Sequence, residues 1–174
     1  MRSKTLINTL ISRVVMSAVA AFLLMANATA ADKPNFSGTW VMDKSRSFGI
    51  PPDMEQTLVV VHNGDKITVE IKIVTSAGER VINDVYTLDG KESEFVAQTP
   101  RGPGGKGKRT SSWLPDGNRI VINEDSTVET PNGPLALQQM RKWSLSADGA
   151  TLTIDYYTDS ARGSGESKRV YVKK

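Results

Sequence analysis

The feature that most constrains the fold is a succession of short segments in which apolar and polar residues alternate, each broken by a turn signal. The clearest is residues 66–73, where every second residue is isoleucine or valine. Such alternation places the apolar side chains on one face of a β-strand. Asn63-Gly64 precedes this segment and adopts the positive φ angles of a tight hairpin turn. The pattern therefore predicts antiparallel hairpins.

Alternation and turn signals together predict ten strands, at residues 39–43, 57–62, 66–73, 80–88, 92–98, 109–114, 118–125, 135–145, 151–157 and 168–173. Residues 44–56 have room for one helical turn, which Pro51-Pro52 limits. No segment is long enough for the crossover of a parallel sheet. An up-and-down barrel and a two-sheet sandwich remain. The steady hairpins favour an all-β fold, a single antiparallel up-and-down β-barrel of about 8–10 strands, because closure removes exposed edges.

The first 30 residues have the composition of a secretion signal. Arg2, Lys4 and Arg13 provide its positive charge. An apolar run follows at residues 14–25, and Ala28-Thr29-Ala30 forms a cleavage site. The run is shorter than the roughly 20 residues of a membrane span, although an uncleaved anchor is the alternative. We therefore expect an exported protein, periplasmic or secreted.

Removing the signal peptide, residues 1–30, from the 174 residues leaves one barrel domain of 144 residues, 31–174, which is large enough to hold its own core. The chain has 22 basic and 19 acidic residues, and three of the basic ones belong to the signal, so the domain is close to neutral. Nucleic-acid binding is not expected from this balance. The absence of cysteine excludes disulfides, thiol catalysis and a lipid-modified cysteine. We expect a monomer without a cofactor and without membrane insertion after cleavage.

The domain opens with Asn35-Phe36-Ser37-Gly38-Thr39-Trp40, and Asp43-Lys44-Ser45 follows. This opening resembles the start of bacterial exported lipocalin-like proteins and, more broadly, of the calycin superfamily of lipocalins and fatty-acid-binding proteins. In those families a Gly-x-Trp opens the first strand, and its tryptophan plugs the closed end of the barrel. The resemblance implies a lipocalin-like barrel around a small molecule, with Gly38 and Trp40 as the structural plug. From the residues alone, Trp40 is either this plug or the floor of a ligand pocket.

The predicted strand at residues 135–145 carries the most informative interior pattern. One of its faces is apolar at both ends and places Gln139 and Arg141 between them, so both are expected inside the barrel. A buried arginine needs a partner, which is an internal acid, a backbone carbonyl or an anionic ligand. We therefore take Gln139 and Arg141 as candidate ligand-binding residues. The structural alternative places Arg141 near the rim or stacked on Trp143.

The last predicted strand contains Arg169-Val170-Tyr171. It resembles the last strand of fatty-acid-binding proteins, and this resemblance implies that Arg169 and Tyr171 hold a ligand carboxylate. The alternation leaves two registers open, because a shift of one residue reverses the face of every side chain. An arginine that closes over the Trp40 ring is the structural alternative.

Three further strand aromatics, Tyr86, Trp113 and Tyr156, are candidate ligand-binding residues. Tyr86 is in phase with Leu88, and Tyr156 is in phase with Ile154. This phase predicts that both tyrosines face the interior, where they either line a pocket or fill the core.

Residues 99–108 are rich in glycine, proline and positive charge, which predicts a long flexible loop. The charges of this stretch and of the residue after it are Arg101, Lys106, Lys108 and Arg109. They either contact an anionic surface or remain solvated. The stretch approaches a phosphate-binding loop in sequence, but Arg109 and a strand follow in place of a hydroxyl residue and a helix. We therefore predict no nucleotide site.

His62 is the only histidine and lies at a predicted hairpin corner. With no second histidine and no cysteine, no metal site is predicted. No nucleophile, base and orienting group occur together, so an enzyme is not expected. The leading hypothesis is a barrel that binds a small apolar or amphipathic molecule in a cavity of roughly 300 Å³ or more. The alternative is a filled barrel that acts through its loops and surface, as an envelope interaction or inhibitor-like module.

Overall fold

The computed structural model describes residues 33–99 and 102–174, so the predicted signal peptide lies outside the described residues. The elements of the described part are β1 (Gly38–Met42), the 3-10 turn η1 (Lys44–Arg46), β2 (Glu55–Asn63), β3 (Lys66–Thr75), β4 (Gly78–Thr87), β5 (Ser93–Thr99), β6 (Gly102–Trp113), β7 (Arg119–Thr130), β8 (Gly133–Leu145), β9 (Thr151–Ser160) and β10 (Gly165–Lys173). The all-β class and the ten predicted strands are confirmed. Within the described residues, no helix has the length and apolar character to span a membrane.

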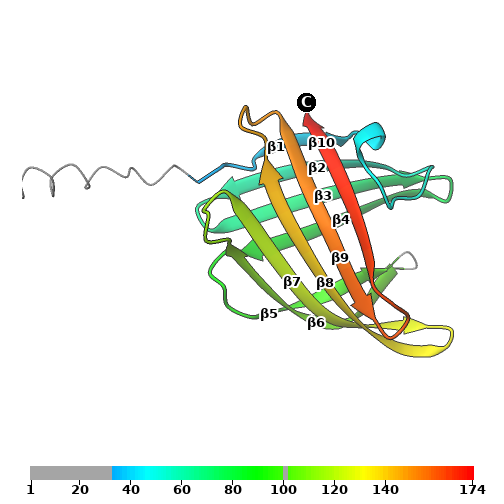
Figure 1. Ribbon diagram of the computed structural model, residues 1–174. Coiled ribbons are helices and arrows are strands. Elements are labelled where there is room, and N and C mark those ends of the chain that lie inside the picture. Colours follow the sequence, from blue (N-terminus) through cyan, green and yellow to red (C-terminus); the bar gives the residue numbers. More distant parts are fainter. Residues whose placement is uncertain (1–32, 100–101) are drawn as a thin grey trace, which may run out of the picture. The chain divides into compact units, whose positions relative to one another are not determined.

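The ten strands form one antiparallel sheet that curls into a nearly closed up-and-down barrel (Figure 1). Each strand pairs with its neighbours in sequence, and β1 also pairs with β10, so the sheet is continuous across the two ends of the barrel domain. The sheet is interrupted between β4 and β5, which lie at its two edges. We call this interruption the β4–β5 seam. Near it, an isolated bridge joins Asp89 to Ser112, and Gly90 N–H donates to Ser111 O at 3.0 Å.

Strand β6 corrects the prediction of a flexible loop at residues 99–108. Gly102–Trp113 is a strand that pairs with β5 on one side and with β7 on the other. Glycine is required in it, because a Cβ on Gly105 would lie 2.1 Å from the carbonyl oxygen of Thr127. A glycine inside a strand commonly marks such a close approach of two backbones. The composition that predicts flexibility therefore allows β6 to lie tightly against β7. Arg101 lies outside the described residues.

One end of the barrel is filled by apolar side chains. Trp40 is fully buried there, and its indole Nε1–H donates to Phe36 O at 2.9 Å. The cation over the Trp40 ring is Lys173, whose Nζ lies 5.2 Å from the ring centroid, and not an arginine. Gly38 has a φ of 143°, and a Cβ at this position would lie 2.7 Å from Lys173 Cε. The other members of this core are Phe36, Met42, Leu58, Val60, Ile67, Val69, Tyr86, Leu88, Ile120, Ile122, Trp143, Leu152, Ile154 and Tyr171.

The connection between β1 and β2 runs along β10 and helps to fix its register. Asp43 N–H donates to Val170 O at 2.7 Å, and Val170 N–H donates to Ser47 Oγ at 3.0 Å. The sequence leaves two registers open for this strand. The structure has the one in which Arg169 and Tyr171 face the barrel interior. Val170, which alternation assigns to the opposite face, is also buried beside this connection.

Candidate binding cavity

The barrel encloses a cavity of about 190 Å³ in the half that lies away from Trp40. Its polar lining consists of Gln56, Arg80, Asp84, Gln98, Arg109, Glu124, Ser126, Gln139, Arg141, Tyr156 and Arg169. Its apolar lining consists of Met54, Ile71, Ile73, Ile82, Phe95, Val96, Ala97, Val128 and Leu137. The volume is smaller than the roughly 300 Å³ of common ligand pockets. The interior is therefore neither filled nor large.

A buried carboxylate holds two arginines together inside the barrel. Glu124 Oε1 accepts a hydrogen bond from Arg109 Nε at 2.5 Å and a second one from an Nη of Arg141. Glu124 is 7% exposed, Arg109 5% and Arg141 6%, so all three charges are removed from water. Burial by itself lowers the pKa of Arg141, but Tyr86 and Glu124 raise it above its ordinary value, and the guanidinium stays charged. Of the three partners that sequence leaves open for Arg141, the structure shows an internal acid, Glu124.

A second carboxylate completes this arrangement from β4. Arg109 Nη2 donates to Asp84 Oδ1 at 3.0 Å, and Arg109 Nη1 donates to Val85 O at 3.1 Å. The Tyr86 hydroxyl donates to Asp84 Oδ2 and accepts from Arg141 Nη1, both at 3.0 Å. Burial raises the pKa of Tyr86 far above its ordinary value, so this hydroxyl keeps its proton. We call Asp84, Tyr86, Arg109, Glu124 and Arg141 the Glu124 cluster, in which two cations face two anions.

The structure corrects the prediction that Arg109 belongs to a basic stretch at the surface. Its guanidinium carbon lies 4.6 Å from the Tyr86 ring centroid and 4.3 Å from that of Phe95, so it is held between two aromatic rings. The side chain reaches from β6 to β4 and bridges the β4–β5 seam. Lys106 and Lys108, which alternate with it along β6, are exposed. Phase along the strand, and not local composition, decides which cation is buried.

A second polar group lies on β2, β9 and β10. Arg169 Nη1 donates to Gln56 Oε1 at 3.2 Å and to the Tyr156 hydroxyl at 3.1 Å. The Tyr171 hydroxyl donates to the same Gln56 oxygen at 2.7 Å. The Arg169 guanidinium carbon also lies 4.2 Å from the Tyr156 ring centroid. We call Gln56, Tyr156, Arg169 and Tyr171 the Arg169 cluster. Its acceptors are neutral oxygens, and no ion pair to Arg169 occurs among the described residues.

Two arginines of the lining keep a donor without an acceptor. Within the described part of the chain, the buried Nε–H groups of Arg141 and Arg169 have no hydrogen-bond partner. Buried polar groups are nearly always satisfied, by protein, water or a bound molecule. The cavity therefore offers unsatisfied donors on two cations, an arrangement suited to a polar or anionic group.

A further hollow of about 330 Å³ lies beside the cavity at the mouth of the barrel. It shares Met54, Ile73 and Arg80 with the cavity lining. Its rim is tied by Asp53, whose Oδ2 accepts from Ser76 N–H at 2.9 Å and from Ser76 Oγ–H at 2.5 Å. The hollow is therefore a separate, largely apolar space next to the cavity, toward the β3–β4 turn.

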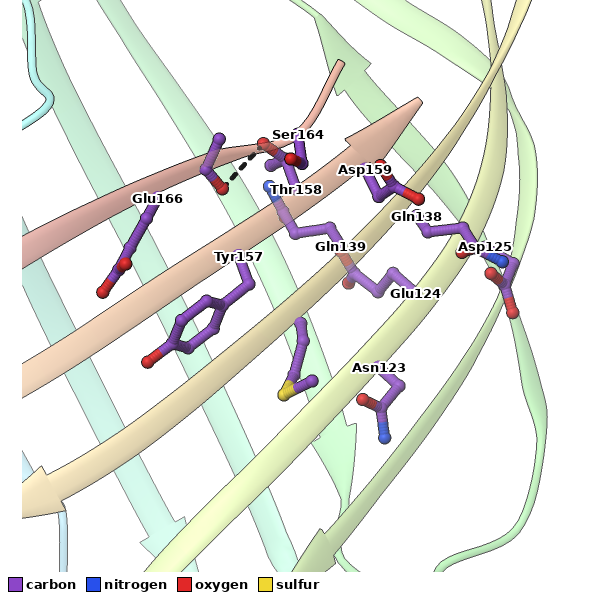
Figure 2. Close-up of a pocket in the computed structure, with 12 residues that line it drawn as sticks. Asn123, Glu124, Asp125, Gln138, Gln139, Tyr157, Thr158, Asp159, Ser164 and Glu166 are labelled. Carbon is purple, nitrogen blue, oxygen red and sulfur yellow. Dashed lines mark hydrogen bonds between the residues drawn. The ribbon is translucent and has the colours of Figure 1, made fainter. Parts of the chain in front are cut away.

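A wider groove of about 590 Å³ lies on the outer face of β7, β8 and β9 (Figure 2). Asp125, Gln138 and Asp159 face one another across these strands and form one row of it. Successive residues of a strand point to opposite faces. The Asp125 side chain therefore points to the outer face and the Glu124 side chain to the interior, although both residues line the groove. The groove and the cavity lie on opposite sides of the same sheet.

The structure brings most of the predicted ligand-binding residues to one region. Gln139, Arg141, Tyr156 and Arg169 line the cavity. Tyr86 and Tyr171 lie behind this lining and contact it through their hydroxyls, by way of Arg141 and Gln56. Trp113 lies apart from them, toward the closed end, where its ring centroid is 6.0 Å from that of Phe36 and 5.9 Å from that of His62.

Sequence reasoning missed four residues of the two clusters: Gln56, Asp84, Arg109 and Glu124. Glu124 is in phase with Ile120 and Ile122, and Asp84 is in phase with Ile82. This phase is a signal that could have placed both carboxylates inside, although an acidic residue in a strand is usually assigned to the solvent face.

His62 lies at the closed end and holds the segment that precedes β1. Its Nδ1 accepts from Phe36 N–H at 3.3 Å, and its Nε2 lies 3.0 Å from Gly64 O. These partners fit a neutral ring with the proton on Nε2. Burial lowers the pKa of His62. Across the described ranges, no group of three or more His, Asp or Glu side chains is placed to hold a metal ion.

No model of a protein family matches the chain, and no curated protein matches its sequence. Among solved structures it is similar to the ileal bile acid-binding protein of zebrafish complexed with cholic acid, with 20% identity over 80% of this chain and 98% of that chain and a TM-score of 0.51. It is also similar to secretory abundant heat soluble protein 4 of Ramazzottius varieornatus, with 14% identity over 82% of this chain and 96% of that chain and a TM-score of 0.48. The first likeness shows a shared fold, the calycin-type barrel.

Proposed function

We propose that this chain is an exported binding barrel that takes up a small amphipathic molecule with one negatively charged head. The observation that carries this proposal is Arg169, a half-buried cation with a buried Nε, whose hydrogen-bond acceptors are the neutral oxygens of Gln56 and Tyr156. A buried charge without a counter-ion is costly. An anionic head beside Arg169 would supply the missing charge and an acceptor for its Nε–H.

The charge balance of the interior selects Arg169 over the other arginines of the two clusters. In the Glu124 cluster, Arg109 and Arg141 are compensated by Glu124 and Asp84. The Arg169 cluster contains no carboxylate, so Arg169 is the position at which an added anion is most favourable.

The sizes of the two neighbouring spaces set the shape of the ligand. The cavity of about 190 Å³ accepts a head group and a short stretch of chain. The hollow of about 330 Å³ at the mouth, lined by Pro51, Met54, Ile73 and Ala77 among others, would cover an apolar tail. Burial of apolar surface contributes about 25 cal/mol per Å². An amphipathic acid with a short apolar chain therefore fits better than a large rigid molecule.

Export to the periplasm or the exterior and membership of the bacterial lipocalin-like proteins belong to the same proposal. The basic and apolar residues of the first 30 positions support export. The solved neighbour is complexed with cholic acid, a carboxylic acid with a large apolar surface, which supports an amphipathic acid as the ligand class. The support for this ligand class is the shared fold, and a binding experiment on this chain tests it.

Isothermal titration with decanoate, one carboxylate on a nine-carbon chain, tests the proposal. Arg169→Gln removes the uncompensated cation, and its affinity for decanoate should fall roughly 10- to 100-fold, the value of a charge-assisted hydrogen bond. Arg162→Gln removes an equal charge from an exposed turn and should leave the affinity unchanged. Equal affinities of Arg169→Gln and the unaltered chain, or no binding by the unaltered chain, would contradict the proposal.

A second candidate function is a module that acts through its outer surface. The observation in its favour is that the cavity is smaller than the roughly 300 Å³ of common ligand pockets, while the outer groove measures about 590 Å³. Native mass spectrometry of protein purified from its own host separates the two functions. A co-purified small molecule supports the binding barrel, whereas a bare chain with a co-purified macromolecule supports the surface module.

A further inference from the structure

We infer that Glu124 is a specificity-determining residue, an internal counter-ion that occupies Arg141 and restricts the cavity to ligands with a single charge on the head. The inference rests on the proposed function and concerns the same cavity. It goes further by assigning a role to a residue that would not itself hold the ligand.

The geometry places Glu124 where a second ligand anion would have to bind. Arg141 and Arg169 both line the cavity, and both lie next to Tyr156. Tyr156 faces Arg141 across β8 and β9, and its hydroxyl accepts from Arg169. A head with two anionic groups could pair with both guanidiniums only if the charge of Arg141 were not already compensated. One carboxylate oxygen of Glu124 already accepts from Arg141 and from Arg109.

Exclusion of a second anion follows from like-charge repulsion in a buried site. Glu124 is 7% exposed, and water can screen its charge only weakly there. A ligand carboxylate placed on Arg141 would lie close to the Glu124 carboxylate, and both would share one guanidinium. Unpaired like charges of this kind are a common means by which proteins reject the wrong ligand. A head with one charge avoids the conflict by binding Arg169.

Replacement of Glu124 by glutamine isolates this charge. Glutamine has nearly the same shape and keeps an oxygen that accepts from both arginines. It removes the negative charge, so Arg141 becomes a second uncompensated cation. The site of Glu124→Gln should then accept a head with two carboxylates.

The test compares decanoate with octylmalonate, which carries two carboxylates on the same nine-carbon chain. The unaltered chain should bind decanoate more tightly, by about tenfold or more. In Glu124→Gln the affinity for octylmalonate should rise by about tenfold or more, while that for decanoate changes little. The ratio of the two affinities is the quantity to measure, because a general loosening of the barrel changes both together.

Asp84→Asn is the matched control. It removes the same charge from the same cluster, but Asp84 contacts Arg109 and Tyr86 and not Arg141. The ratio of affinities in Asp84→Asn should equal that of the unaltered chain. If Glu124→Gln does not fold, the double variant Arg109→Gln with Glu124→Gln removes one cation with the anion and provides the same comparison.

The outcomes separate the inference from the proposed function. An unaltered chain that binds decanoate through Arg169, with the same ratio in Glu124→Gln, overturns the inference and leaves the proposed function standing. An equal shift of the ratio in Asp84→Asn also overturns it, because the effect would then follow total charge and not the occupancy of Arg141. An unaltered chain that binds neither ligand overturns the proposed function, and the inference with it.

Discussion

The two polar clusters of the barrel interior are built from similar residues but differ in charge balance. The Glu124 cluster pairs two arginines with two carboxylates and a tyrosine, and it spans the β4–β5 seam. The Arg169 cluster contains one arginine and only neutral acceptors. A buried arginine is therefore not by itself a ligand site. A compensated arginine holds strands together, and an uncompensated one remains available for a ligand.

The largest effect is expected when the carboxylate that Arg109 and Arg141 share is removed. Glu124→Ala leaves Arg109 and Arg141 buried without their common acceptor. Loss of one partner of a buried ion pair costs about 3–5 kcal/mol. Urea unfolding followed by tryptophan fluorescence should show a loss of this size. A loss below about 1 kcal/mol would mean that the cluster does not hold the seam.

A smaller loss of stability is expected when Phe95, whose ring packs against Arg109 of the Glu124 cluster, is replaced. Phe95→Leu removes the ring that lies 4.3 Å from the Arg109 guanidinium, and should lower the free energy of unfolding by about 1–2 kcal/mol. Phe48→Leu is the control, because Phe48 is 47% exposed and lies 5.8 Å from a lysine ammonium. Its expected effect is within about 0.5 kcal/mol. Equal losses in the two variants would argue against a special contribution from the ring stacked on Arg109.

Truncation of Arg169 should change the stability of the fold little, in contrast to truncation of Glu124. Arg169→Met removes a cation without a counter-ion, and Gln56 Oε1 still accepts from the Tyr171 hydroxyl. The free energy of unfolding should change by less than about 1 kcal/mol, in either direction. Decanoate binding should nevertheless be lost. A large loss of stability would show that Arg169 is needed for the fold, and the contrast between the clusters would fail.

The smallest effect is expected at alkaline pH, where each cluster contains one buried tyrosine. Burial raises the pKa of Tyr86 and of Tyr171 above the ordinary value of 10.0. Above pH 10 the unfolded chain releases these protons while the folded chain keeps them, so stability falls as the pH rises. Tyr86→Phe and Tyr171→Phe should each make this fall shallower, measured by thermal unfolding between pH 9 and 11. An unchanged slope in both variants would show that neither phenol keeps its proton in the folded state.

Most of the fold was readable from alternation. The ten predicted segments correspond to the ten strands, because a side-chain period of two is imposed by the backbone and does not depend on distant contacts. The exception was β6, whose glycines predict flexibility. Gly105 is required by its distance to a residue of another strand, Thr127. A prediction from neighbouring residues in the sequence cannot include a distance to another strand.

Part of the candidate site could be predicted from the sequence, because the phase of a strand decides which side chains face the interior. Phase placed Gln139, Arg141 and Tyr156 inside, and the structure shows them in the cavity lining. Phase does not reveal which interior charges meet. The contact of Glu124 with Arg109 and Arg141 depends on register across three strands, β6 to β8, and Asp84 enters from the far side of the seam. Charge compensation is therefore the property of the interior that sequence leaves undetermined.

The pairing of β1 with β10 has a consequence for the covalent order of the chain. Lys174 N–H donates to Thr39 O at 2.9 Å, so the last residue lies beside the start of β1. A short linker from residue 174 to residue 33, with new ends opened between β4 and β5, would give a circular permutant that runs from β5 through β10 to β4. In that molecule the order of synthesis would coincide with the order of the hydrogen-bonded sheet. Its new termini would lie at the two strands that already lack a mutual ladder, where a cut interrupts no strand pairing.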